Sequence, residues 1–446
     1  METFFSALAE FENILWSFVG FPVVMLLGLY LTFRSGFVQI RKLPEVIFTF
    51  VSFFKVKEVE GTVHPLKAFF ACIGGCVGIG NIVGICTAVQ IGGPGALFWI
   101  WMTALFGSTV KYAEVYLGVR HRISDKDGYH GGPMYFLTRV FTTRWVPGLV
   151  CLLLCVYGVE VYQFSVITSS VSTNLPVSKY FVIGVLLVLV LFAGSGGVRR
   201  VGNISSAVIP LFVVLYVSMG GWVLYQNFAA IPAVLKQVIH SAFDGHAALG
   251  GFLGSTMLMA ISQGVRRGCY TADLGIGYAS VIHSESSAQV PEKQAALVIF
   301  DIFLDTFIVC TSSLLMILVT DVWHQPIQTD QLVQTALSAY FPYMNYFMPF
   351  FLFMLGYSTI TAYFCVGLKC AQFLSAKWGK PLYYAYSIVI LTVFSFVDSY
   401  QAQMVMSVAG GLLLALNCYG IFKLRNELSF DLDQPDQGEF VTVQAS

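Results

Sequence analysis

The sequence predicts an all-α polytopic membrane protein that has about eleven transmembrane helices. The chain has 446 residues, of which 57% are hydrophobic and only 11% are charged. Ordinary soluble domains carry about 25% charged residues. Apolar stretches long enough to cross a bilayer recur from the N-terminal region to about residue 425. The formal net charge is zero, so the composition gives no signature of nucleic-acid binding.

The apolar stretches follow one another in order along the chain. They cover roughly residues 13–33, 66–90, 95–119, 147–173, 178–195, 203–226, 249–272, 294–320, 343–371, 381–398 and 402–422. Between the sixth and seventh spans, we expect residues 231–243 to form a short helix that lies in the membrane interface. The N-terminus, METFFSALAEFEN, is acidic and has no Lys or Arg, so we expect the first span to be kept rather than cleaved. The tail from Leu424 to residue 446 is polar, and we expect it to be mobile and cytoplasmic.

Lysine and arginine residues are distributed unequally between the two sets of loops. With the N-terminus outside, 21 of the 24 fall on the inner side, including Arg266 and Arg267. Only Lys179 and Lys236 fall outside, and Lys111 lies within a span. Because positive charge concentrates on the cytoplasmic side of membrane proteins, the bias predicts an outside N-terminus and an inside C-terminus.

The spans divide into two groups of five when the extra N-terminal helix at 13–33 is set aside. The first repeat covers 66–226 and the second covers 249–422, which together form one membrane transport domain. An odd number of spans in each repeat gives the two repeats opposite topology. Both repeats begin with a glycine-rich span, IGGCVGI at 73–79 and LGGFLGS at 249–255. Such interrupted spans at corresponding places of inverted repeats point to a transport site at the bilayer midplane.

Glycines interrupt the apolar stretch 71–88, ACIGGCVGIGNIVGICTA. The interrupting residues are Gly74, Gly75, Gly78, Gly80, Gly84 and Asn81. Glycine inside a helix costs roughly 1 kcal/mol relative to alanine. Small residues also serve close helix packing, but the matching position in both repeats favours a helix that opens locally. Opened backbone is tolerated in a membrane where protein buries it or where it lines a cavity.

Two groups of ionisable residues lie inside predicted spans, where a charge needs a partner or a function. Lys111 and Glu114 are three residues apart on one span, and we expect them to neutralise each other. Asp301 and Asp305 are one helical turn apart and repel each other when both are charged. They would serve protons or cations, or one of them would meet Lys293 near the inner surface.

Two further spans carry polar side chains. Glu160 and Gln163 share one helix face, where an amide would either bind a ligand or link helices. Ser358, Thr359 and Thr361 place three hydroxyls within about one turn. Hydroxyl oxygens beside opened carbonyls suit a hard cation such as sodium, and the alternative is hydrogen bonding of each hydroxyl to its own helix.

No motif in the sequence indicates an enzyme. There is no phosphate-binding loop, no metal-ligand constellation and no Ser-His-Asp arrangement. The ten cysteines lie mostly within apolar spans, as small packing residues do. We therefore expect no catalytic residues and no organic cofactor.

The chain resembles the alanine or glycine:cation symporter family. The densest match is GNIVGICTAVQIGGPGALFWIWMTALFGSTVKYAEVYLGVRHR at 80–122, followed by GGPM at 131–134. Further matches are RRGCYTADLGIG at 266–277, DTFIVCT at 305–311 and YSTI at 357–360. The resemblance implies a leucine-transporter-like fold of the amino acid–polyamine–organocation superfamily, with one extra N-terminal helix. It also implies transport of small amino acids, typically alanine or glycine, together with sodium.

The resemblance implies a site that is unwound at Gly80 and Asn81 and closed by the spans of Gln163 and Ser358–Thr359. We expect substrate contacts from Gly80, Asn81, Gly84, Gln163, Ile261 and Tyr363. We expect sodium ligands from Gly78, Asn81, Ser358 and Thr359. Glu160 and Asp305 are candidates for coupling or proton transfer.

Three positions depart from the family pattern. The family usually reads Ser-Asn-Glu-Ala-Gly where this chain has TADLG at 271–275. Glu160 stands in place of an expected Asn, and Tyr363 in place of an expected Trp. The last two positions match segments that should face the site, so the departures bear on substrate and coupling ion.

These observations together predict a secondary active symporter that takes up a small neutral amino acid with Na⁺ by alternating access. The first alternative is proton coupling through Glu160. The second is a transport-incompetent sensor or structural protein of the same fold. We expect a monomer in a bacterial cytoplasmic (inner) membrane, with the lipid bilayer, the amino acid and Na⁺ as its partners.

Overall fold

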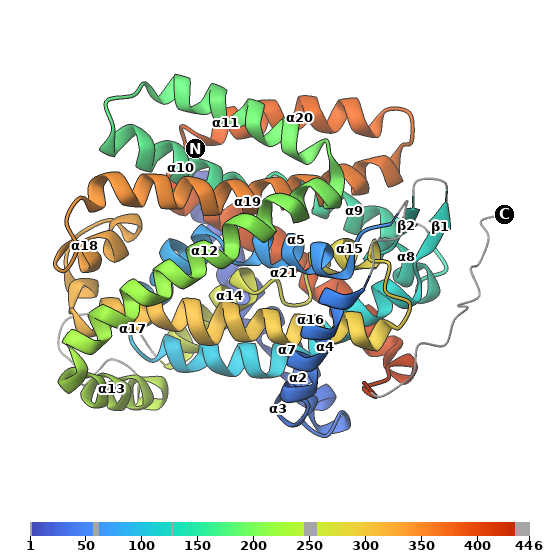
Figure 1. Ribbon diagram of the computed structural model, residues 1–446, viewed down its shortest axis with the longest axis horizontal. Coiled ribbons are helices and arrows are strands. Elements are labelled where there is room, and N and C mark those ends of the chain that lie inside the picture. The colour runs from blue at the N-terminus through green and yellow to red at the C-terminus, as the bar shows by residue number, and fades with distance from the viewer. Residues whose placement is uncertain (1, 57–61, 126–127, 144, 245–256, 433–446) are drawn as a thin grey trace.

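The computed structural model describes residues 2–56, 62–125, 128–143, 145–244 and 257–432. The predicted all-α fold is confirmed, since 82% of the residues are helical. Most of the long helices run side by side (Figure 1). Helices α13 and α18 lie at one end of the bundle, whereas a short β-hairpin and α8 lie at the opposite end (Figure 1).

The first part of the chain supplies an N-terminal helical arm and two long packed segments. The arm consists of α1 (Glu2–Ile14), the π-helix η1 (Leu15–Gly20), α2 (Phe21–Arg34), α3 (Val38–Arg41), α4 (Leu43–Ser52) and the short helix η2 (Phe53–Lys55). Then come α5 (Pro65–Cys76), the π-helix η3 (Gly80–Gly84), α6 (Cys86–Gly92) and α7 (Ala96–Arg120). The antiparallel hairpin of β1 (Ile123–Asp125) and β2 (Gly128–His130) leads into α8 (Pro133–Phe136) and η4 (Leu137–Arg139).

The middle of the chain is a series of helices with short connections. They are α9 (Trp145–Tyr157), α10 (Val161–Asn174), α11 (Lys179–Gly194), α12 (Gly197–Gln226), η5 (Phe228–Ala230) and α13 (Ile231–Asp244). Helix α13 confirms the short helix predicted at 231–243. The glycine-rich residues 249–255 lie outside the described part of the chain.

The last part of the chain begins with α14 (Met257–Thr271), α15 (Tyr278–Ser284), α16 (Pro291–Ile302), the π-helix η7 (Phe303–Cys310) and α17 (Thr311–Val319). It continues with η8 (Val322–His324), η9 (Thr329–Gln331), α18 (Leu332–Ser338), α19 (Met344–Leu374), α20 (Gly379–Phe394), α21 (Ser399–Lys423) and η10 (Arg425–Glu427). Helices lie in the described part of each of the eleven predicted ranges. Six of the described helices are long and apolar enough to cross a membrane, and one bent pair makes a seventh, so the count of eleven stays a prediction.

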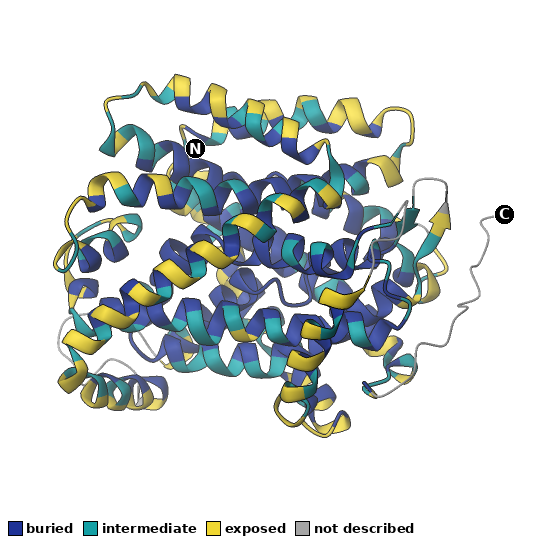
Figure 2. Ribbon diagram, in the orientation of Figure 1, coloured by how far each residue is buried: buried dark blue, intermediate teal, exposed yellow. Residues whose placement is uncertain are grey.

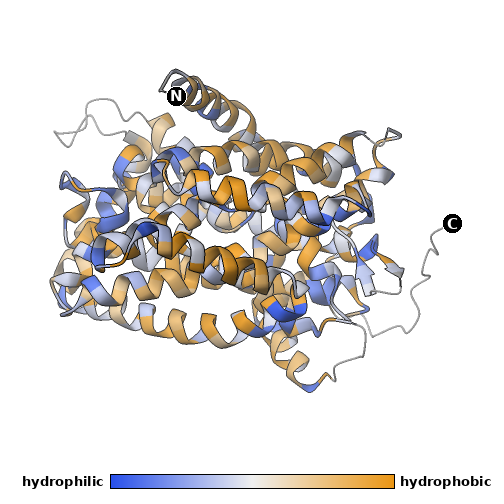
Figure 3. Cartoon of the chain, turned by 90° about the horizontal axis from the view of Figure 1, so that it is seen from above, coloured by the Kyte–Doolittle hydropathy of each residue, from blue (hydrophilic) through white to orange (hydrophobic). Residues whose placement is uncertain are grey.

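The outer surface of the bundle is apolar where the helices are peripheral. Figure 2 shows the buried residues gathered in the central helices. Figure 3 shows hydrophobic residues along the middle of the helices and hydrophilic residues toward their ends. On α11, Phe181 and Phe192 are 66% and 65% exposed. Such large exposed apolar surface is unusual for a soluble monomer, and it fits a multi-pass membrane protein.

The N-terminal helix is longer than predicted and is held to the core. Thr3–Arg34 forms one helical run, which begins about ten residues before the predicted span. Its Glu12 forms a buried ion pair with Arg266 at 3.0 Å. Arg266 and Arg267 are both buried within α14, so their assignment to an inner loop was wrong. Without these two arginines, 19 of the 21 lysines and arginines assigned to the inner side remain there.

The start of the C-terminal tail is packed and not free, which contradicts the predicted mobility for residues 424–432. Leu428 and Leu432 are buried. The Tyr112 hydroxyl donates a 2.9 Å hydrogen bond to the Ser429 carbonyl, and the Tyr112 ring stacks on Phe430. The apolar side chains of Leu428, Phe430 and Leu432 anchor this otherwise polar segment to the helical bundle. Residues 433–446 lie outside the described part of the chain.

A buried ion pair links α7 to α16. The Lys111 Nζ lies 2.6 Å from Asp301 Oδ2, and both side chains are fully buried. Lys111 therefore does not neutralise Glu114, and Asp301 meets Lys111 where Lys293 had been considered. The Glu114 carboxylate instead accepts hydrogen bonds from the N–H groups of Gly277 and Ser280, both at 3.1 Å. Neighbouring helices supply these partners, so spacing along one helix did not reveal them.

We expect the variant Lys111→Met to lose about 3–5 kcal/mol of unfolding free energy, because it leaves the buried Asp301 carboxylate without its counter-charge. Thermal and denaturant unfolding of the purified protein in detergent would measure the loss. The double variant Lys111→Met with Asp301→Leu should recover much of it. Lys236→Met, at an exposed position, is the control. A Lys111→Met protein as stable as wild type would contradict a structural role for the pair.

Candidate functional site

The first interrupted helix lies between α5 and α6. Helix α5 ends at Cys76, and Val77 has an extended ψ of 90°. The chain then re-enters a helix at η3, and the two segments meet at an angle of 42°. An interruption within the glycine-rich stretch is therefore confirmed. Its predicted place at Gly80 and Asn81 was wrong, because the break lies at residues 77–79 and both of these residues belong to η3. An interruption of this kind frees backbone N–H and C=O groups inside the bundle.

Side chains hydrogen-bond to the freed N–H groups at this break. The Gly78 N–H donates to Asn81 Oδ1 at 2.9 Å, one turn later in the same segment. The Ile79 N–H donates to Gln163 Oε1 at 3.1 Å, which links the break to α10. These amide oxygens lie where the oxygens of a bound carboxylate could accept the same hydrogen bonds.

Two glycines at the break are required by close approach of other helices. A Cβ at Gly75 would lie 2.0 Å from the Tyr278 hydroxyl of α15. A Cβ at Gly78 would lie 2.3 Å from Thr359 Oγ1 of α19 and 2.8 Å from Gln163 Oε1. The absence of side chains thus lets three helices contact the opened backbone.

A second interruption lies between α14 and α15, but not where it was predicted. Helix α14 runs unbroken through residues 257–264, which contradicts an opening there; residues 249–256 lie outside the described part of the chain. The chain leaves the helix at residues 272–277, where Asp273, Gly275 and Gly277 have φ values of +49°, +70° and +105°. Aspartate and glycine tolerate this left-handed backbone. The departure from the family pattern at 271–275 therefore falls at the break itself.

Asp273 connects the two interruptions. Its carboxylate accepts a 3.2 Å hydrogen bond from the Tyr157 hydroxyl and a further one from the Tyr363 hydroxyl. The Cys76 thiol, at the end of α5, donates to the same carboxylate at 3.5 Å. The predicted substrate residue Tyr363 therefore binds the second break in this structure, and its ring stacks on Tyr278 at 4.4 Å.

Asn81 and Asp305 form a polar contact between the first break and η7. The Asn81 side-chain amide donates to Asp305 Oδ1 and, at 3.2 Å, to the Cys310 sulfur. The other Asp305 oxygen accepts from the Thr306 hydroxyl at 2.9 Å. The Ser313 hydroxyl donates to the Asn81 carbonyl at 2.7 Å. Both predicted residues, Asn81 and Asp305, are thus neighbours in a fully buried group of oxygens.

The hydroxyls of α19 meet the carbonyl end of α5. Thr359 Oγ1 lies 3.1 Å from the Gly74 carbonyl oxygen and 3.3 Å from the Leu355 carbonyl oxygen. Ser358 Oγ lies 2.8 Å from Ser205 Oγ of α12. Of the predicted sodium ligands, Ser358 and Thr359 therefore lie beside the Gly74–Gly78 stretch, whereas the Asn81 side chain bonds to the Gly78 N–H through its oxygen and to Asp305 through its nitrogen.

Glu160 lies at a third irregular point, between α9 and α10. Its φ is +47°, and Oε1 accepts a 2.6 Å hydrogen bond from the Tyr270 hydroxyl of α14. Its other oxygen, Oε2, is buried and has no hydrogen-bond partner. Gln163, one turn further on, reaches the first break. The two predicted residues of this span thus contact the two broken helices separately.

Aromatic rings enclose the polar groups. Tyr157 packs edge-on against Tyr363 at 5.3 Å and against Tyr270 at 6.4 Å, and Tyr162 packs edge-on against Tyr270 at 6.3 Å. A Cβ at Gly80 would lie 3.4 Å from the Tyr270 ring. The polar side chains between the rings, such as Asp273 and Glu160, are fully buried, so their hydrogen bonds act in a low dielectric.

Two remaining predicted residues lie at the edges of this centre. A Cβ at Gly84 would lie 2.7 Å from the Gln403 amide nitrogen and 3.2 Å from the Tyr162 hydroxyl. Ile261 is buried on α14, and its side chain carries no polar atom, so it can offer a ligand apolar contact only.

One buried cluster resembles a metal site in its residue types. Ligand atoms of Cys72, Cys76 and Asp301 lie within 4.8 Å of one another. The ammonium of Lys111 lies 2.6 Å from Asp301 Oδ2 and 3.2 Å from the Cys76 sulfur. A fixed positive charge therefore occupies the place that a metal cation would take, and the cluster does not fit a metal ion.

Sequence reasoning predicted Tyr363 but missed Asp273, Tyr157 and Tyr270 as central residues. Asp273 carries a usable signal, since an acidic residue lies between glycines inside a membrane segment. The tyrosines carry none, because aromatic residues are common on packed helix faces.

Two pockets lie toward opposite ends of the bundle. One of about 220 Å³ lies beside η3, η9 and the start of α21, and one of about 850 Å³ lies beside α8, α15 and the end of α19. A salt bridge between Glu285 and Lys369 lies among the lining residues of the larger pocket. Neither lining includes a predicted substrate or sodium residue, so the centre is enclosed between them.

Comparison with known proteins agrees with this architecture. A family model described as the sodium:alanine symporter family matches residues 1–434. The sodium/alanine symporter AgcS of Methanococcus maripaludis is 30% identical over 387 residues, which are 83% of this chain and 84% of AgcS. The probable sodium/glutamine symporter GlnT of Bacillus subtilis is 29% identical, covering 93% of this chain and 87% of GlnT.

A solved structure shows the same fold at low sequence identity. The crystal structure of MhsT in complex with L-phenylalanine superposes with a TM-score of 0.56 at 14% identity, covering 80% of this chain and 88% of MhsT. The family and these relatives are transporters and not enzymes. The chain belongs to the sodium:alanine symporter family and is a membrane transporter with the leucine-transporter-like fold.

Proposed function

We propose that this protein takes up a small neutral amino acid together with Na⁺ by alternating access. One observation carries the proposal: two interrupted helices meet at an enclosed polar centre inside an apolar bundle. Opened backbone at such a place offers N–H and C=O groups to a zwitterion, which an unbroken helix cannot do. Membership of the family and the name of AgcS support alanine as the substrate, whereas the name of GlnT supports glutamine.

The substrate carboxylate would bind at the first break. It would accept the Ile79 N–H now bonded to Gln163 and a further N–H in the Gly78–Gly84 segment, where the dipole of the following half-helix favours an anion. Gln163 would turn to donate its amide to the carboxylate. The ammonium group would bind carbonyl oxygens of residues 272–277. Gly80, Gly84, Ile261 and Tyr363 would shape the remaining walls.

Sodium would bind beside α19. The Thr359 and Ser358 hydroxyls and the Gly74 carbonyl offer oxygen ligands within the reach of one another, which hard cations prefer. One Na⁺ moving down about 100 mV releases roughly 2.3 kcal/mol. A tenfold sodium gradient adds about 1.4 kcal/mol. The sum supports an accumulation of a few hundredfold, so one ion suffices for scavenging.

The two interrupted helices would begin two inverted repeats. Under this proposal α5–α12 and α14–α21 form the repeats predicted at 66–226 and 249–422. The end of the bundle with α13 and α18 would face outward, and the end with the β-hairpin would face the cytoplasm. We propose a monomer in a bacterial cytoplasmic membrane, with its C-terminus inside.

Uptake by proteoliposomes tests the proposal. We expect radiolabelled alanine, glycine or glutamine to accumulate above the outside concentration when an inward sodium gradient is imposed, and not when choline replaces sodium. Purified protein that accumulates none of the three under any gradient would contradict transport and favour a sensor or structural role.

Removal of the α19 hydroxyls should weaken sodium binding. In the double variant Ser358→Ala with Thr359→Ala, we expect the half-saturating sodium concentration for uptake to rise at least about tenfold, equivalent to about 1.4 kcal/mol. Thr361→Ala is the control, because the Thr361 hydroxyl bonds to carbonyls of its own helix at 2.9 Å. An unchanged sodium requirement in the double variant would remove this ion site.

Proton coupling is the second candidate, because Glu160 has a buried carboxylate oxygen without a partner. If sodium is the coupling ion, Glu160→Gln should keep sodium-driven uptake, since glutamine still accepts a hydrogen bond from Tyr270. Uptake in sodium-free buffer under an acid-outside gradient, lost in Glu160→Gln and retained in Glu427→Gln at the molecular surface, would favour proton coupling. The variant Asp305→Asn tests the second candidate carboxylate in the same way: loss of proton-driven uptake in sodium-free buffer would favour proton coupling through Asp305.

A further inference from the structure

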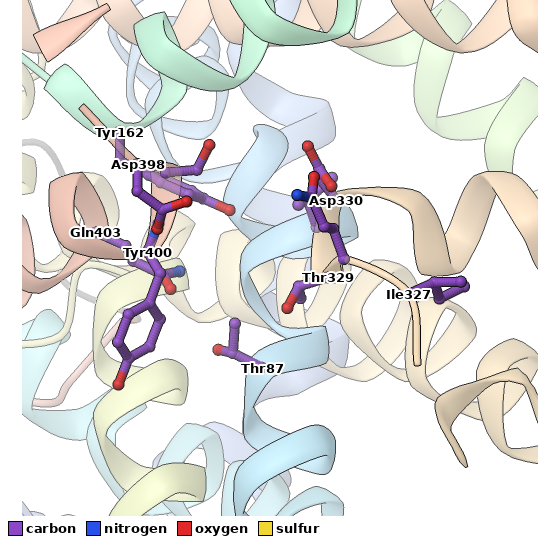
Figure 4. Close-up of a pocket in the computed structure, with 11 residues that line it drawn as sticks. Thr87, Tyr162, Ile327, Thr329, Asp330, Asp398, Tyr400 and Gln403 are labelled. Carbon is purple, nitrogen blue, oxygen red and sulfur yellow. The ribbon is translucent and has the colours of Figure 1, made fainter. Parts of the chain in front are cut away.

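The smaller pocket lies directly against the first broken helix. Val83 and Thr87 of the broken segment line it, together with the loop before α18 and the start of α21. Figure 4 shows Asp398, Tyr400 and Gln403 on one side of the pocket and Thr329 and Asp330 on the other, with Thr87 between the two groups. The pocket holds about 220 Å³, enough for a small amino acid or for several waters.

Two carboxylates give the pocket its charge. Asp330 and Asp398 both line it, and its eleven lining residues include no Lys, Arg or His. One oxygen of Asp330, Oδ1, is buried and has no hydrogen-bond partner. Burial raises the pKa of Asp330, and the neighbouring charge of Asp398 raises it further. A cation bound between the two carboxylates would favour their charged forms and so counteract this rise in the pKa of Asp330.

The loop that carries Asp330 is fixed in place. The Gln90 side chain of α6 donates to the Ile327 carbonyl at 3.5 Å and accepts a hydrogen bond from the Thr329 hydroxyl. Asp398 is held as well, because it caps α21 by accepting the Tyr400 N–H at 2.9 Å. The two carboxylates are therefore positioned by secondary structure and do not merely share a flexible surface.

A buried amide at the floor of the pocket lacks partners. Gln403 is 1% exposed, and neither its Oε1 nor its Nε2 has a hydrogen bond. An unpartnered buried amide costs about 1–3 kcal/mol, so a ligand that satisfied it would gain that interaction. The amide nitrogen of Gln403 and the Tyr162 hydroxyl lie 2.7 Å and 3.2 Å from the position that a Cβ on Gly84 would take. Gln403 and Tyr162 therefore separate the pocket from the break.

The geometry points to a second cation-binding site in this pocket, formed by Asp330, Asp398 and Gln403. It would hold a monovalent cationic group, either the ammonium of an amino acid or Na⁺. This inference rests on the proposed function, because it places the pocket on the entry path to the first break. In that topology the pocket opens toward the outside.

The chemistry of the three residues suits such a group. An ammonium has three N–H donors, and two carboxylates with one amide oxygen supply three acceptors. Hydrogen bonds between an ammonium and a carboxylate are stronger than those between neutral groups. The same oxygens would ligate Na⁺.

Equilibrium binding to the purified full-length protein tests the inference. Radiolabelled L-alanine and ²²Na⁺ would be titrated onto wild type and onto the double variant Asp330→Asn with Asp398→Asn. Asparagine caps a helix about as well as aspartate, so α21 should stay folded. We expect the double variant to lose one bound alanine per chain if the ammonium is the occupant, or one bound Na⁺ per chain if sodium is. Unchanged stoichiometry for both ligands would overturn the inference.

Asp321→Asn is the matched control. Asp321 lies in the same connection between α17 and α18, but its side chain is 73% exposed and bonds to His324. It should keep wild-type stoichiometry, and a loss equal to that of the double variant would overturn the inference by showing a general effect of surface charge. The single variant Asp330→Asn, which leaves the cap untouched, should show a weaker second site than wild type.

Binding and uptake together separate the two proposals. Wild-type protein that binds the second ligand but accumulates no amino acid would contradict the proposed function and leave the site intact. If the wild type accumulates the amino acid, and if the wild type and the double variant bind the same number of alanine molecules and Na⁺ ions per chain, the second site alone would be contradicted.

Discussion

A peptide group that leaves a helix inside a membrane must find another hydrogen-bond partner, and this constraint organises the centre of the protein. The first break receives an amide from Gln163 on α10, and the second receives the Glu114 carboxylate from α7. Because each partner comes from a different helix, opening the backbone also fixes the packing of its neighbours. The glycines at the break remove the side chains that would keep these partners away.

The same polar groups explain how a closed centre could open. Asp273 gathers hydroxyls from Tyr157 and Tyr363 and the thiol of Cys76, so it couples the two broken helices to α9 and α19. Gln163 accepts a hydrogen bond from the Ile79 N–H, which under the proposed function would donate to the substrate carboxylate instead. Binding would therefore exchange protein–protein hydrogen bonds for protein–substrate ones with little net penalty, and small changes in these bonds can shift the helices between arrangements. Pockets on both sides of the enclosed centre fit such an exchange.

The sequence predicted the class of fold and the presence of the first break, since both depend on local composition and glycine spacing. It did not predict the break at 272–277, because the Gly277 N–H is bonded by Glu114 of α7 and the Asp273 carboxylate by side chains of α5, α9 and α19, which local spacing does not reveal. The predicted opening at 249–255 lies outside the described residues. Partners of buried charges were also beyond reach: Lys111 pairs with Asp301 across helices, not with Glu114 on its own. Residues predicted for sodium lie in two neighbouring groups, one at Thr359 and one at Asn81, because side-chain directions at an opened helix do not follow helical spacing.

An experimental structure of the protein with sodium and the transported amino acid bound tests the central claim most directly. The amino acid should lie between the two breaks, with its carboxylate on N–H groups of the Gly78–Gly84 segment and its ammonium facing residues 272–277. Gln163 should have left the Ile79 N–H. Density for the amino acid elsewhere, with both interruptions still bonded only to protein side chains, would contradict the claim that the broken helices form the binding site.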